Sequence, residues 1–96
     1  MPRTKSNVFA IVTIANTPVR ALQENPKRIC WSAVNTSDTD VFFGHDQNVA
    51  TSGRTKGWPI RANYGAVEDE FSKDEVWIVC AASDKEVIIQ EVTEAD

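Results

Sequence analysis

The sequence predicts an all-β fold: a single small antiparallel β-sandwich of jelly-roll type with about eight short strands. Short apolar runs rich in valine and isoleucine recur along the chain, and β-branched residues favour strands. Turn residues interrupt these runs about every eight to twelve positions, a spacing typical of sandwiches and barrels. No stretch of the sequence has the length and periodicity of an amphipathic helix.

Four strands are expected in the first half of the chain. They cover residues 8–15, 18–24, 28–34 and 40–44. Turn residues separate them at Asn16-Thr17-Pro18, at Asn25-Pro26 and at Asn35-Thr36-Ser37-Asp38. In these segments Asn, Asp and Ser side chains bond to the nearby backbone and proline fixes φ, so each segment favours a reversal of the chain.

Four more strands are expected in the second half. They cover residues 58–62, 67–71, 75–82 and 85–92. The first of these begins after Gly57, and Ser83-Asp84 makes a tight reversal between the last two. The longest irregular stretch, residues 45–57, is expected to be a surface loop that joins the two sheets, and such loops often carry contacts.

One domain is expected, with a short arm before it. Residues 8–96 are assigned to the sandwich, and residues 1–7 to an N-terminal arm with Arg3 and Lys5 but too few apolar residues to fold alone. The arm leads into an apolar run too short to span a bilayer. We therefore expect no signal peptide, no membrane segment and synthesis in a cytosol.

The net charge of −4 hides an asymmetry between the two parts of the chain. Residues 1–61 hold eight Lys or Arg and four Asp or Glu, a net charge of +4, whereas residues 62–96 hold two and ten, a net charge of −8. Interleaved strands would let these charges neutralise each other locally. Otherwise one edge of the domain is basic and another is acidic, and identical copies can meet head to tail or dock on a charged scaffold.

Two cysteines, Cys30 and Cys80, lie within expected strands, and we interpret both as small buried hydrophobic residues. An immunoglobulin domain needs a tryptophan well after the first cysteine and a tyrosine two residues before the second. Here Trp31 directly follows Cys30 and Ile78 stands two residues before Cys80, so that family is disfavoured. The sequence leaves open whether the two cysteines pair.

Residues 8–12 and 76–82 are apolar on both faces of their strands. Either long loops or the arm cover the outer face of these strands, or a neighbouring chain does. Trp31 and Trp77, in strand interiors, are expected in the core. Trp58 stands where a loop meets a strand and is expected to be exposed to a partner.

Catalytic chemistry has few candidate residues. His45 is the only histidine, so a metal site or a cysteine–histidine pair would rest on it alone, and we interpret it as a strand-end cap. Glu68-Asp69-Glu70 and Asp74-Glu75 supply carboxylates for calcium but lack EF-hand spacing, which favours a solvated acidic strand and turn. We predict no catalytic residue, no metal, no cofactor and no enzymatic activity.

Five residues are the candidates for partner binding: Arg3, Lys5, Arg54, Lys56 and Trp58. A net-acidic chain lacks the broad basic footprint that nucleic acids require, so a stacking platform for single strands around Trp58 is a minor alternative. A carbohydrate-binding β-sandwich is a second alternative, since sugar sites use exposed tryptophan and acidic side chains.

Four segments carry a resemblance to a known family. They are Asn25-Pro26-Lys27-Arg28 with the strand that ends at Asn35, Asp40-Val41-Phe42-Phe43-Gly44, Trp58-Pro59-Ile60, and Glu75-Val76-Trp77-Ile78-Val79-Cys80-Ala81-Ala82. In order and spacing, over residues 18–92, the chain resembles the small β-sandwich virion proteins of tailed bacteriophages. Such proteins serve as head decoration or cement proteins, as head-fibre modules or as tail parts.

The resemblance implies a non-enzymatic decoration or cement protein that binds the outer capsid lattice and stabilises the head. The implied partners are the major capsid protein and other copies of the chain, with a trimer as one candidate homo-oligomer, and neither nucleic acid nor membrane. The implied location is the capsid surface of the virion, after synthesis in the host cytoplasm. A tail or fibre component and a non-enzymatic carbohydrate-binding sandwich are the alternatives.

Overall fold

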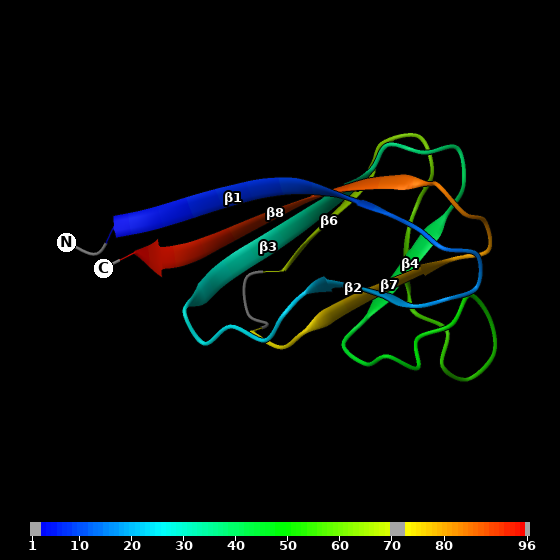
Figure 1. Ribbon diagram of the computed structural model, residues 1–96, viewed down its shortest axis with the longest axis horizontal. Helices are drawn as coiled ribbons and strands as arrows, with labels where there is room; N and C mark the ends of the chain where they lie inside the picture. The colour runs from blue at the N-terminus through cyan, green and yellow to red at the C-terminus, as the bar shows by residue number, and fades with distance from the viewer. Residues whose placement is uncertain (1–2, 70–72, 96) are drawn as a thin grey trace.

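The computed structural model describes residues 3–69 and 73–95, which form eight strands and no helix. Two four-stranded antiparallel sheets pack face to face (Figure 1). The 1-8-3-6 sheet contains, in spatial order, β1 (Arg3–Val12), β8 (Glu86–Ala95), β3 (Arg28–Asn35) and β6 (Gly65–Asp69). The 2-7-4-5 sheet contains β2 (Val19–Leu22), β7 (Val76–Cys80), β4 (Val41–Gly44) and β5 (Trp58–Ile60).

The chain changes sheet at nearly every connection, and only β4 and β5 are neighbours both in sequence and in space. This connectivity is that of a jelly roll, in which two Greek keys close into a double sheet. The predicted fold class is therefore confirmed, and each expected strand overlaps one observed strand.

Residues 3–7 differ from the expectation of a separate arm, because they form the first half of β1 and pair with β8 from Arg3↔Ala95 to Asn7↔Glu91. Backbone pairing needs no apolar side chain, so a polar segment can extend a strand as long as its partner continues alongside. Figure 1 shows β1 and β8 projecting together beyond the other strands, and Arg3 pairs with Ala95 at the free end. Residues 1–2 of the expected arm lie outside the described residues.

The core lies between the sheets and is built from inward-facing residues of both sheets, which alternate along β3, β7 and β8. It comprises Ala21, Leu22, Trp31, Ala33, Val41, Ile60, Val76, Ile78, Cys80, Val87 and Ile89. Trp31 is buried as predicted and meets the Phe43 ring edge-on across the two sheets, with ring centroids 5.1 Å apart. Cys80 is buried as predicted, whereas Cys30 is half-buried on the other sheet, and the two are not bonded to each other.

Two expectations about the 2-7-4-5 sheet were wrong. Trp77 is half-buried and faces outward, because its neighbours Val76 and Ile78 take the inward positions of β7. Residues 45–57 do not join the two sheets but return the chain from β4 to β5 within one sheet. The loop instead covers the outer side of that sheet, since the buried Val49 lies against Gly44 and Gly57.

Buried Arg28 ties the start of β3 to three other segments. Its Nε donates to Glu91 Oε2 on β8 at 2.8 Å, its Nη1 to the Asp74 carbonyl at 2.7 Å, and its Nη2 to the Gln23 carbonyl. A guanidinium has five donors in a fixed fork, which suits a site with several acceptors. This end of the sandwich is thus held together by one side chain.

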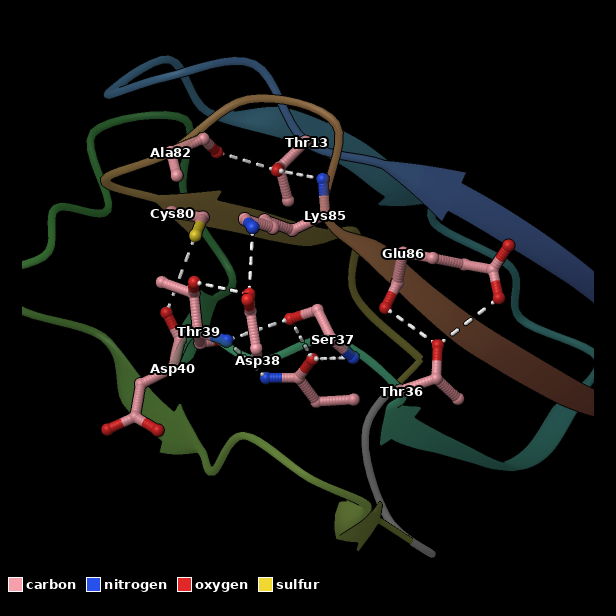
Figure 2. Close-up of polar contacts among 11 residues, drawn as sticks. Thr13, Thr36, Ser37, Asp38, Thr39, Asp40, Cys80, Ala82, Lys85 and Glu86 are labelled. Carbon is pink, nitrogen blue, oxygen red and sulfur yellow. Dashed lines mark hydrogen bonds and ion pairs between the residues drawn. The ribbon is translucent and has the colours of Figure 1, made fainter.

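The opposite end is closed by polar contacts between two turns (Figure 2). Lys85 Nζ forms an ion pair with Asp38 Oδ1 at 2.7 Å, and the Thr13 hydroxyl donates to the Ala82 carbonyl at 2.8 Å. Hydrogen bonding to Lys85, then to Thr39, holds the pKa of Asp38 below its ordinary value, and the same ion pair raises the pKa of Lys85. Both pKa shifts are thus consequences of a contact between turns and do not mark a reaction site.

Candidate interaction surface

The outward side of the 1-8-3-6 sheet has apolar residues on all four strands, together with polar residues such as Ser32 and Gln90. Phe9, Trp31 and Ile89 point inward, so alternation along each strand sends the residues beside them outward. We use "outer face" for these outward positions, whose apolar members are Val8, Ala10, Val12, Cys30, Val34, Ala66, Ile88 and Val92. Among its larger apolar members, Val8 and Val12 on β1 are the most open, with 60% and 51% of their surface exposed.

Strand register makes these residues continuous. Ala10 lies opposite Ile88, Ile88 opposite Val34, and Val34 opposite Ala66, so one apolar row crosses all four strands from edge to edge. Side chains directly opposite in a sheet lie within contact distance. An apolar surface that spans a whole sheet is typical of a protein–protein interface, whereas scattered exposed apolar residues are not.

The two sheets differ in what covers their outward apolar residues. On the 2-7-4-5 sheet the β4–β5 loop covers outward residues: Val79 is buried and Trp77 is half-buried. On the 1-8-3-6 sheet no described segment of the chain lies over Val8 and Val12, which stay exposed. The described part of the chain therefore leaves this face bare.

The five candidate partner-binding residues are all exposed but do not converge. Arg3 and Lys5 lie near the free end of the projecting β1–β8 ribbon, whereas Arg54, Lys56 and Trp58 belong to the β4–β5 loop and the start of β5 (Figure 1). Lys56 and Trp58 thus border one hollow, Arg54 belongs to the same loop, and Arg3 and Lys5 lie on a different strand.

A hollow of about 410 Å³ opens beside the β4–β5 loop, between Phe43, His45, Asp46, Lys56 and Trp58. Trp58 is 70% exposed, which confirms its expected exposure. His45 follows β4 and its Nδ1 lies 3.0 Å from the Glu75 carbonyl, a contact that fits the expected strand-end role. The hollow offers a ring for stacking and a few polar groups, but no nucleophile beside a base.

Metal binding has no support among the described residues, where no three His, Cys, Asp or Glu side chains gather at a common point. The carboxylates considered for calcium belong to β6 and to the following connection, of which Glu70 lies outside the described residues. Within residues 3–69 and 73–95, no helix is long and apolar enough to cross a membrane.

Comparison with known proteins gives a likeness of fold. No protein-family model matches the sequence, and no curated protein matches it. A solved structure from Bacillus endospore appendages, described as a family of disulfide-linked pili, superimposes with a TM-score of 0.55 at 12% identity, over 99% of this chain and 89% of the other. At this identity the likeness concerns the fold, and it extends over nearly the whole of both chains.

The outer face as a unit was not foreseen from the sequence, apart from the lack of alternation in residues 8–12. Val34 and Ile88 are apolar residues at outward positions of strands that also carry polar residues outward, Ser32 on β3 and Gln90 on β8. Their membership of a continuous row depends on the register between strands that are far apart in the sequence. A signal was present in β8, where Val87, Ile88 and Ile89 are consecutive apolar residues and cannot all face one core.

Proposed function

We propose that this chain is a non-enzymatic structural subunit of a repetitive surface assembly, in which the outer face packs against a neighbouring subunit. The continuous apolar row across the 1-8-3-6 sheet supports this role, because such a face is favourable only when another surface removes it from water. Burying it in many copies gives a large total stabilisation, since contacts within an assembly act at high effective concentration.

The similarity to the pilus protein supports the same kind of role. That protein is described as part of endospore appendages that form pili, and it shares this fold over 99% of the present chain. We therefore place the working location of this chain in an assembled structure outside a cell or on a particle surface.

As the finer proposal we take a bacteriophage head decoration or cement protein, with the major capsid protein and other copies of the chain as partners. The resemblance to small virion sandwiches over residues 18–92 supports it. A fibre or tail component is the second candidate, and the likeness to a pilus protein favours it. The two differ in copy number and in the part of the particle that contains the chain.

Quantitative mass spectrometry of purified particles, after separation of heads from tails, tests both candidates. Copies in the hundreds that travel with heads would establish decoration, and a few copies in the tail fraction would establish the fibre or tail role. Absence of the chain from both fractions would rule out the virion role. Immunogold labelling of surface filaments then tests the appendage role directly.

A further inference from the structure

We infer, on the basis of the proposed structural role, that copies of this chain stack head to tail through their two sheets. The outer face of the 1-8-3-6 sheet in one copy packs on the outward side of the 2-7-4-5 sheet in the next. The outer face is therefore covered by a second copy of the same chain, which contacts it with the outward side of its 2-7-4-5 sheet.

The outer face has an acidic rim. Glu68 on β6 and Glu86 and Glu94 on β8 take outward positions around the apolar row, and all three are exposed. Among the described strand residues of this sheet, no Lys or Arg shares these outward positions. Its preferred partner is thus a surface that combines apolar groups with basic ones.

The outward side of the 2-7-4-5 sheet has that character. Arg20 on β2 points outward beside Trp77, because the preceding Val19 packs on the core. Arg54 and Lys56 are exposed on the loop that covers this sheet, and the Lys56 ammonium lies 5.5 Å from the centre of the Phe42 ring. The same side also has three half-buried apolar residues at outward positions: Phe42, Pro59 and Trp77.

Two further basic side chains, on β1, point toward the side of the molecule on which the 2-7-4-5 sheet lies. Arg3 and Lys5 occupy the inward phase of β1, but the ribbon projects past the sandwich, so they are exposed on the side where the 2-7-4-5 sheet lies. Lys5 shares a hollow with Asn25, from the connection that follows β2. Acids are present as well: Glu91 lines the same hollow as Lys5, Asp46 is exposed on the β4–β5 loop, and Glu75 is half-buried before β7.

The fold thus turns the charge asymmetry of the sequence into two unlike sides. The acidic part of the chain supplies β6 and β8 of one sheet, and the basic part supplies β2 and the β4–β5 loop on the other. Back-to-back pairing of two outer faces would place acidic rims against each other, which opposes association. Unlike sides in contact form a heterologous interface, which closes into a ring or continues as a filament.

Paired charge reversal tests the stacking. One variant carries Glu68→Lys and Glu86→Lys, the other carries Arg54→Glu and Lys56→Glu, and Glu24→Lys in the β2–β3 loop is the matched control on neither side. Sedimentation velocity reports assembly, and circular dichroism reports the fold. Each reversed variant alone should need about a tenfold or higher concentration to assemble, because like charges now meet. An equal mixture should assemble like the wild type, since each variant presents what the other requires.

The outcomes separate this inference from the proposed function. Assembly of the Arg54→Glu, Lys56→Glu variant at the wild-type concentration overturns head-to-tail stacking, because back-to-back pairing leaves that variant unchanged. Failure of the mixture to assemble overturns it as well. A wild-type chain that sediments at its monomer mass of 10.7 kDa at every concentration overturns self-stacking, while the copy number in purified particles still decides the structural role.

Discussion

Single residues hold the two ends of the sandwich, and Arg28 is the clearest case. Its guanidinium is fully buried and satisfies acceptors on β8 and in two connections. The sequence marked Arg28 only as part of a turn signature, because its burial depends on Glu91, which is 63 residues away along the chain. Sequence patterns over a few neighbouring residues cannot predict a contact between residues so far apart.

Replacing Arg28 by Ala should lower the free energy of unfolding by about 3–5 kcal/mol, because Glu91 and two carbonyls lose a buried charged partner. Urea denaturation followed by tryptophan fluorescence measures the change. Arg61→Ala is the matched control: its ion pair with Asp40 is exposed, so its removal should have little effect. Equal stability of the two variants would show that Arg28 is not a structural tie.

The Asp38–Lys85 ion pair predicts a dependence of stability on pH. The folded-state pKa of Asp38 is lowered from 3.8, so this contribution is present above that value and is lost as the pH falls through the folded-state pKa. The pKa of Lys85 is raised from 10.5, so its contribution is present below that value and is lost as the pH rises further.

Asp38→Asn should therefore flatten the fall in Tm below about pH 4 while leaving its slope near neutral pH unchanged. Calorimetry across the acid range checks this. Asp84→Asn, in the neighbouring turn, is the control with the same chemical change. A Tm profile of Asp38→Asn that parallels the wild type at low pH would contradict the role of the pair.

At the scale of elements, apolar runs and turn residues located the strands, because both depend on neighbouring residues. The sequence did not reveal that β1 begins at Arg3, since pairing with β8 rather than side-chain polarity extends the strand. It also misplaced the β4–β5 loop, because composition shows that a loop exists but not which strands it joins. The loop folds back on its own sheet through Val49.

The projecting ribbon should be dispensable for folding. Removing residues 1–6 takes away residues 3–6 of β1, which are exposed and do not join the core, so the free energy of unfolding should fall by about 1 kcal/mol or less. Removing residues 1–10 also takes away Phe9, which packs on the core, and should cost about 3–5 kcal/mol or prevent folding. Similar losses in the two truncations, measured by urea denaturation, would show that the ribbon is part of the folding unit.

At the scale of the whole molecule, the jelly roll provides one sheet whose outer side is covered by its own loop and one whose outer side is bare. The fold class and the exposure of Trp58 were predictable from the sequence. The bare face was not, because it is formed by residues from four strands brought into register only in three dimensions.

The outer face is tested most directly by sedimentation of the wild type beside a Val8→Lys, Val12→Lys variant, with Ile14→Lys as the control. Ile14 is 55% exposed, close to the other two, but lies beyond the end of β1. We predict that the wild type and Ile14→Lys assemble with concentration, whereas the double variant stays monomeric with an unchanged fold. Assembly of the double variant at the wild-type concentration would contradict the claim that this face joins one subunit to the next.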